Sequence, residues 1–159
     1  MMARANSLAF HAMSRQISTL FAARIIRSAA RAGLDPTPLY RHAGIDENTV
    51  NFPPISEERH LGLWELVMRA GKDPTFPLRY ATDVTLDDYG VLGLAAKTAP
   101  TAGAALEVVC KHLPAYTDAI GLSAHRDRAG VFIEVERAGA LTLGRRASTE
   151  SMVAEIVSA

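Results

Sequence analysis

Few of the side chains that could carry out catalysis lie at spacings that would bring them together. The chain has five histidines and one cysteine, and no two histidines stand four apart, as a zinc-binding pair on a helix would. Cys110 and His112 lie two apart in a stretch with helical spacing, so their side chains point to different faces. Of the adjacent Asp87 and Asp88, one side chain faces away from the other. The sequence therefore predicts no metal site and no enzyme.

A pocket for a small molecule is the remaining chemical possibility. Binding pockets combine apolar walls with a few polar groups, and several large side chains with polar tips stand in or beside predicted core segments. They are Trp64, Arg79, Tyr80, Tyr89, Lys97, His112 and Tyr116, and we predict them as candidate ligand contacts. Each has a plainer alternative as a half-buried structural residue. Trp64 is favoured as a core anchor, and His112 has a third interpretation as an axial ligand of haem.

Composition limits the classes of protein to consider. The chain has 159 residues, enough for one domain, and its 17 basic residues balance its 17 acidic ones. A freestanding nucleic-acid binder usually carries a basic excess, so this neutral chain is not predicted to be one. One cysteine excludes an internal disulfide and fits a reducing compartment. No signal-peptide core or run of about eighteen apolar residues occurs, so we expect a cytoplasmic location without a membrane span.

The first half of the chain has helical spacing. Residues 1–14 are predicted as a loose tail, and a helix is predicted from Arg15 to a glycine cap at Gly33. Three arginines of this helix, at positions 24, 27 and 31, are predicted to face solvent, with a DNA-binding surface as the less favoured alternative. Further helices are predicted after Asp35, Ser56 and Asp73, residue types that accept hydrogen bonds from free helix N–H groups.

The middle of the chain predicts two consecutive helices. Gly90 and Gly93 bracket a tight turn, where a backbone without Cβ can pack closely, and residues 91–96 form an almost wholly apolar segment that we expect to be a buried helix. Pro100 ends it. Thr101 is predicted to cap an amphipathic helix that runs to Tyr116.

Later segments alternate apolar and polar residues. Residues 120–124 and 131–135 predict two strands joined by a polar loop that ends in Gly130, and so a hairpin near 119–136 with one face packed on the helices. Two strands alone are marginally stable, so more strands or a partner chain are expected. The predicted fold class is α+β: a helical N-terminal half with a small antiparallel sheet. Residues 15–159 are predicted as a single domain.

Helical spacing resumes from Arg145. Thr149, Met152, Val153 and Ile156 lie on one stripe that continues to Val157, and we expect this stripe to pack on a partner or another domain. The chain then stops at Ala159 without a helix cap. We expect the sequence to be a fragment or a truncated reading frame.

Four separated stretches between about Ile17 and Val157 resemble one protein family, and the strongest of them has two parts. Residues 88–93 (DYGVLG) and 99–106 (APTAGAAL) carry the strongest match, and residues 32–45, 55–65 and 71–79 add weaker ones. Pro77 departs from the family pattern. The chain resembles the N-terminal effector-sensing domain of AraC-type transcription regulators, often labelled the arabinose-binding-like domain.

The resemblance implies a regulatory domain rather than an enzyme. It implies binding of a small metabolite, homodimerisation, and DNA contact only through a C-terminal helix-turn-helix domain that is absent from this chain. No cofactor is implied. The alternative is a stand-alone small-molecule or haem sensor that acts by protein–protein contact.

Overall fold

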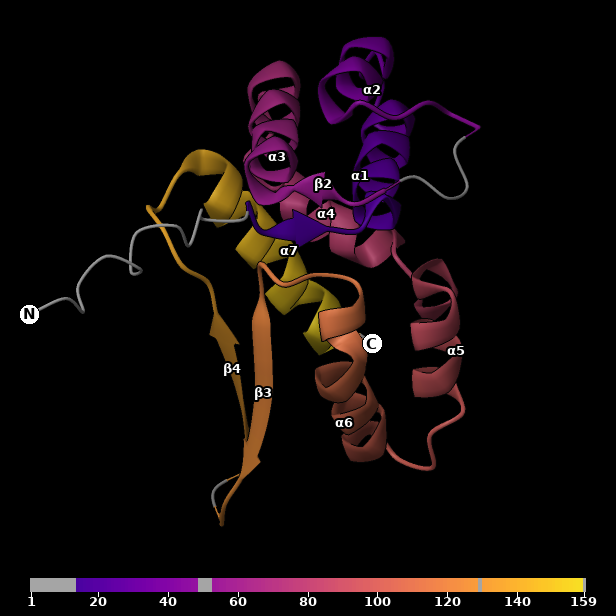
Figure 1. Cartoon of the computed structure of the whole chain (residues 1–159), viewed down its shortest axis with the longest axis vertical. Helices are drawn as coiled ribbons and strands as arrows, with labels where there is room; N and C mark the ends of the chain where they lie inside the picture. The colour runs from indigo at the N-terminus through magenta and orange to yellow at the C-terminus, as the bar shows by residue number, and fades with distance from the viewer. Residues whose placement is uncertain (1–13, 49–52, 129, 159) are drawn as a thin grey trace, which may run out of the picture.

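Helices dominate the structure, which is a computed structural model that describes residues 14–48, 53–128 and 130–158. The predicted tail at residues 1–14 lies outside the described residues except for Ser14. The element order confirms an α+β fold whose N-terminal half is helical and whose longer hairpin follows it (Figure 1). The elements are β1 (Gln16–Ile17), α1 (Thr19–Arg31), α2 (Thr37–Ala43), β2 (Ile55–Ser56), α3 (Glu57–Gly71), α4 (Phe76–Asp83), η1 (Leu86–Tyr89), α5 (Val91–Lys97), α6 (Ala102–His112), η2 (Leu113–Ala115), β3 (Gly121–Arg126), β4 (Val131–Glu136) and α7 (Leu143–Ser158).

Capping residues set several helix ends where the sequence predicted them. The Ser56 hydroxyl accepts a hydrogen bond from the Arg59 N–H at 3.2 Å, and the Thr101 hydroxyl accepts one from the Ala104 N–H at 3.1 Å. Helix α2 ends at a glycine cap, Gly44, whose backbone is in the left-handed conformation with φ +69°.

The prediction of a helix from Arg15 is wrong by four residues. Ile17 lies in β1 and pairs with Ile55 of β2, so the helix begins only at Thr19, after the cap residue Ser18. A strand of two residues leaves no recognisable alternation in the sequence, which is why this small sheet was not predicted. The helix predicted from Asp73 also begins later, at Phe76, because the Asp73 carboxylate accepts a hydrogen bond from the Thr75 N–H and holds a turn there.

The Gly90–Gly93 segment is as tight as predicted. Gly90 has φ +58°, and a Cβ on Gly93 would lie 1.5 Å from the Leu86 carbonyl oxygen. The helix after it is only partly buried, contrary to prediction, because Val91 is 78% exposed and Leu94 59% exposed. The amphipathic helix predicted to reach Tyr116 ends at His112 and continues as η2.

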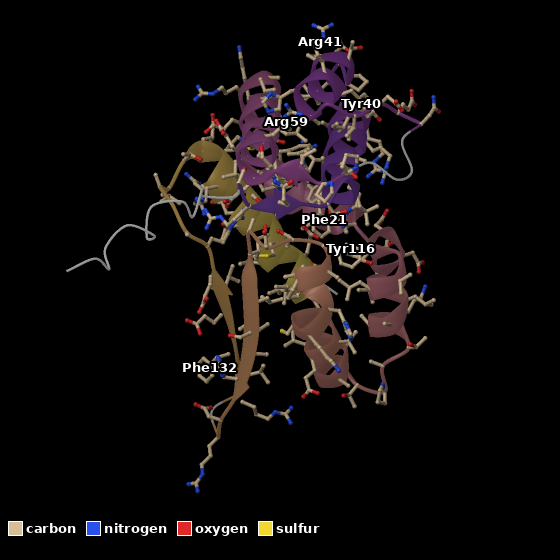
Figure 2. The ribbon with its side chains drawn as sticks, in the orientation of Figure 1. Phe21, Tyr40, Arg41, Arg59, Tyr116 and Phe132 are labelled. Atoms are coloured by element: carbon tan, nitrogen blue, oxygen red, sulfur yellow. The ribbon has the colours of Figure 1, made fainter. Side chains whose placement is uncertain are left out.

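The predicted hairpin is confirmed, with Gly121 opposite Glu136 and Arg126 opposite Val131. It projects away from the helices that surround the core (Figure 1). On the face predicted to pack, Leu122 and Ala124 of β3 and Val135 of β4 are half-buried, whereas Val131 and Ile133 of β4 are 48% and 38% exposed. Phe132, on the opposite face of β4, is 55% exposed and lies far out on the hairpin (Figure 2). The expected packing of one face therefore holds for β3 and only in part for β4.

The core lies between α1, α2, α3 and α4 and is closed by α7. Trp64 is its largest fully buried side chain and meets the rings of Phe76 and Tyr80 edge-on. Helix α7 packs on α3 and α4. Its buried residues are small or polar, and they are Gly144, Arg145, Ala147, Ser148 and Ser151.

The apolar stripe predicted for the terminal helix is only partly covered within this chain. Thr149, Met152 and Ile156 are half-buried, whereas Val153 is 46% exposed and Val157 is 82% exposed. Small side chains allow α7 to lie close to α3, because a helix without bulky groups on one face can bring its backbone near its neighbour. Periodicity alone could not show that the small and polar face would be the buried one.

Candidate functional site

A buried ionic cluster joins α1, η1, α4 and α7. At its centre is Arg24, which is only 4% exposed. The prediction that this arginine faces solvent is wrong, whereas Arg27 and Arg31 are exposed as predicted. Arg24 lies three residues after Phe21 and four before the buried Ser28, so it belongs to the inner face of α1. A guanidinium at that place needs partners from other elements.

Those partners are two tyrosines and a glutamate. The Arg24 Nη2 donates hydrogen bonds to the Tyr80 hydroxyl at 2.9 Å and the Tyr89 hydroxyl at 3.2 Å, and lies 3.0 Å from the Glu155 carboxylate. The Tyr89 hydroxyl donates a second hydrogen bond to the same Glu155 oxygen. The guanidinium also lies over the Tyr89 ring, 4.1 Å from its centroid. We call these four residues the Arg24 cluster.

The Arg24 cluster has hydrogen-bonding capacity left over. Both Nε and Nη1 of Arg24 are buried and have no hydrogen-bond partner among the described residues. Buried donors are nearly always satisfied, because leaving one without an acceptor costs about 1–3 kcal/mol. An acceptor that reaches these nitrogens would therefore be bound favourably.

Four of the seven predicted ligand contacts come together around this cluster. Tyr80 and Tyr89 belong to it, and Trp64 lies beside Tyr80 with 5.2 Å between ring centroids. Tyr116 stacks on Phe21, and its hydroxyl donates a hydrogen bond to the Tyr89 carbonyl at 3.3 Å (Figure 2).

The other three predicted contacts lie elsewhere. Arg79 forms an ion pair with Asp73, Lys97 lies 3.0 Å from Asp87, and His112 is exposed at the end of α6. None of them contacts the cluster through a hydrogen bond or ion pair. Within residues 14–48, 53–128 and 130–158, no three His, Cys, Asp or Glu side chains come together as metal ligands would.

Sequence reasoning missed the two charged members, Arg24 and Glu155. A signal existed for Arg24, because it stands next to the apolar stripe and not opposite it. Glu155 stands four residues after the buried Ser151. Glu155 therefore continues the buried face of α7 formed by small residues such as Ser148 and Ser151. This face can be recognised in the sequence only if small residues are treated as core residues.

A hollow opens at the surface between α1 and α4. It lies one turn along α1 from Arg24. Its volume is about 90 Å³, and its lining combines apolar and charged residues: Ser28, Arg31, Ala32, Phe76, Arg79 and Asp83. The Ser28 hydroxyl donates a hydrogen bond to Asp83 at 3.4 Å, and Arg31 lies 3.6 Å from the same carboxylate. One of the outlying predicted contacts, Arg79, is among the residues that line this hollow.

Comparison with protein families gives a match over most of the chain. Residues 33–159 match the model of the arabinose-binding domain of AraC transcription regulators, an N-terminal domain. The chain belongs to this family. Among curated proteins, none matches it closely enough to count as a relative. No helix within the described residues of this AraC-type domain is long and apolar enough to cross a membrane.

The electrostatics of the AraC-type domain are unusual at Glu155. Burial raises the pKa of its carboxyl from 4.5 to about 7, and this effect outweighs the nearby Arg24 guanidinium, which lowers the pKa. Burial likewise raises the pKa of the Tyr80 hydroxyl. Glu155 is therefore poised to change its protonation state near neutral pH.

This pKa gives a testable pH dependence. Because the folded protein holds the Glu155 proton more tightly than the unfolded chain, the group stabilises the fold at low pH, and this contribution is lost as the pH rises towards 7. Between about pH 5 and about pH 7 we expect a loss of about 2 kcal/mol in the free energy of unfolding from this group alone. Urea unfolding of the wild type and of Glu155→Gln across this range measures it.

His60 changes the pH dependence of stability in the opposite direction to Glu155. Comparing the wild type with Glu155→Gln removes this effect from the measurement. Burial, with the nearby Arg137 and Arg24 charges, lowers the pKa of His60 to about 3, so His60 makes the fold less stable as the pH falls. His60 is present in both proteins, and its effect cancels in the difference. Parallel pH profiles for the two proteins would contradict the assignment to Glu155.

Proposed function

We propose that this domain senses a small metabolite and controls transcription through a DNA-binding domain that family resemblance places C-terminal to it. The observation that carries the proposal is the Arg24 cluster, where a buried guanidinium in a ligand-binding family retains two donors without acceptors. Hydroxyl and carboxylate oxygens are the acceptors that suit a guanidinium, so the effector class is a small polyol, sugar or carboxylic acid.

The α1–α4 interface offers the route by which such an effector would reach Arg24. The hollow beside Arg79 has about 90 Å³, whereas pockets for metabolites usually have about 300 Å³ or more. An effector larger than a few atoms must therefore separate α1 from α4 in order to bind. Because the hollow is too small for a metabolite, binding of the effector would require a change in the packing of α1 on α4.

The signal would leave the domain through α7. Glu155 of α7 is an ion-pair partner of Arg24, so an effector oxygen that takes hydrogen bonds from Arg24 changes how firmly the end of α7 is held. An effector that binds better to one position of α7 shifts the population towards that position. We include a homodimer in the cytoplasm in this proposal, with the exposed Val153 and Val157 side of α7 and the β4 edge as candidate contact surfaces.

Calorimetric titration after a thermal-shift screen of sugars, polyols and carboxylic acids tests the proposal. At a concentration about 100 times its Kd, an effector should stabilise the domain by about 2.7 kcal/mol, which corresponds to roughly 5–10 °C in Tm. Tyr89→Phe, which removes one hydroxyl from the cluster, should weaken its binding by about tenfold. Arg27→Gln is the control, because Arg27 lies on the exposed side of the same helix. Undiminished affinity in Tyr89→Phe and in Arg24→Gln would show that the effector binds elsewhere.

A further inference from the structure

A second buried ionic cluster surrounds Glu57, the first residue of α3. Its carboxylate lies 2.7 Å from Arg15 Nε, 3.3 Å from Arg145 Nη2 and 3.9 Å from Arg137 Nη2. The three guanidiniums come from separate parts of the chain: the residue before β1, the residue after β4, and the first turn of α7. Glu57 and Arg145 are buried, with 6% and 7% exposure.

The cluster around Glu57 carries more positive than negative charge. Three guanidiniums face one carboxylate, and the adjacent His60 stays neutral because burial and the nearby arginines lower its pKa to about 3. Burial lowers the pKa of Arg137 to about 10, and the charges of Arg145 and Arg15 add to this effect while Glu57 opposes it. Buried cations without sufficient anions are costly, because desolvation penalises every charge that lacks a partner.

Arg137 carries unused donors on one edge of its guanidinium. Its Nη1 donates to the Ser148 hydroxyl at 2.9 Å and the Thr149 hydroxyl at 3.3 Å, which fixes the plane of the group against α7. Its Nε and Nη2 are buried and have no hydrogen-bond partner among the described residues. The distance of 3.9 Å from Nη2 to Glu57 is too long for a hydrogen bond.

This unused edge has the shape that binds oxoanions. The Nε–H and one Nη2–H of arginine point in parallel and match two oxygens of a carboxylate or phosphate. Arg145 adds a third donor, because its Nη1 is also buried without a hydrogen-bond partner in the described part of the chain. The side chains of Arg137 and Arg145 are 4% and 9% exposed, so both guanidiniums are held in place before any ligand arrives.

We infer that Arg137 and Arg145 form a binding site for a small oxoanion, either a carboxylate or a phosphate group, beside Glu57. The site is separate from the Arg24 cluster and goes beyond the proposed effector function. The bound anion would accept hydrogen bonds from Arg137 Nε and Nη2 and from Arg145 Nη1. It would also supply negative charge where three cations share one carboxylate.

Entry to this oxoanion site would be through its Arg15 side. The Arg15 side chain is 36% exposed, and its Nη2 donates a hydrogen bond to the Ala138 carbonyl at 3.3 Å. The loop that runs over the site from Ala138 to Leu141 is exposed along its length. Movement of one partly exposed side chain and one exposed loop would therefore admit a small anion without opening the core.

An occupied oxoanion site would hold α7 more firmly. Arg137 follows β4 and binds the hydroxyls of Ser148 and Thr149, while Arg145 lies in the first turn of α7 itself. An anion that joins these two arginines therefore ties the hairpin to the start of α7. The opposite end of α7 is held by Glu155 in the Arg24 cluster.

Calorimetric titration with inorganic phosphate and, separately, with acetate tests the oxoanion site, at constant ionic strength set with sodium chloride. The wild type should bind one of them, and Arg137→Gln should bind it at least about tenfold more weakly, because the paired donors are lost. Arg137→Lys should also bind weakly, since lysine keeps the charge without the parallel donors. Arg126→Gln is the matched control, because Arg126 is exposed at the end of β3.

The anion titrations distinguish the two ligand classes and test whether the site exists. Tighter binding of phosphate points to phosphorylated metabolites, and tighter binding of acetate points to carboxylic acids. The proposed site is wrong if the wild type binds neither phosphate nor acetate detectably, or if Arg137→Gln and Arg126→Gln bind the anion with equal affinity. In either case the unpaired guanidinium nitrogens would be hydrated by water. Circular dichroism confirms that each variant is folded. Arg24→Gln should keep its affinity for the anion, which separates this result from any failure of the proposed effector site.

Discussion

Replacing Arg24 with methionine is expected to lower the free energy of unfolding by about 3–5 kcal/mol at about pH 8, because a buried carboxylate loses its cation. Glu155 would remain in the Arg24 cluster with only hydroxyl partners, and burial already disfavours its charged form. For a chain of this size, the loss corresponds to roughly 6–20 °C in Tm. Thermal and urea unfolding of the wild type and Arg24→Met measure it.

Lower pH should reduce the effect of Arg24→Met. At about pH 5 Glu155 is mostly protonated in the folded protein, so less uncompensated charge remains when the guanidinium is removed. The double variant Arg24→Met with Glu155→Leu should recover most of the loss, since a buried ion pair replaced by apolar residues is often neutral.

A matched control for Arg24→Met is available on the same helix. Arg27→Met makes the same chemical change at an exposed position and should alter stability by about 0.5 kcal/mol or less. Equal losses in Arg24→Met and Arg27→Met at about pH 8 would show that the Arg24 cluster does not stabilise the fold.

Replacing Gly144 with alanine is expected to destabilise the domain by about 3 kcal/mol, because overpacking against backbone forces two helices apart. A Cβ on Gly144 would lie 2.0 Å from the carbonyl oxygen of Leu61 in α3. That oxygen belongs to the backbone of a helix, so no side-chain rotation can relieve the contact. Urea unfolding of Gly144→Ala provides the measurement.

Gly103→Ala is the control for this second prediction. Gly103 lies in α6, and a Cβ there would meet nothing closer than 3.9 Å. Alanine should therefore stabilise this helix by up to about 1 kcal/mol. If Gly144→Ala were as stable as the wild type, the close approach of α7 to α3 would be wrong, and so would the geometry that brings Glu155 to Arg24.

Local signals predicted much of the secondary structure. The hydroxyl caps at Ser56 and Thr101 and the hairpin near 119–136 appear where the sequence placed them. Each depends on contacts within a few residues, so a short stretch of sequence contains the information. The matched residues at 88–93 and 99–106 likewise pointed to the family without knowledge of the fold.

The candidate site could be predicted only in part. Aromatic residues with polar tips, such as Tyr80 and Tyr89, are recognisable in a sequence because they suit a pocket wherever they lie. Arg24 and Glu155 were missed because a charged residue is normally exposed, and only a partner 131 positions away makes its burial possible.

By itself, the sequence determined the α+β class, most helix and strand positions, and membership of the AraC-type sensor family. Only the tertiary structure decided which face of α7 is buried, which arginines leave solvent, and which carboxylates they meet. The physical reason is the range of the interactions. Caps and turns are settled by neighbouring residues, whereas the burial of a charge depends on groups that distant segments bring to within hydrogen-bond distance.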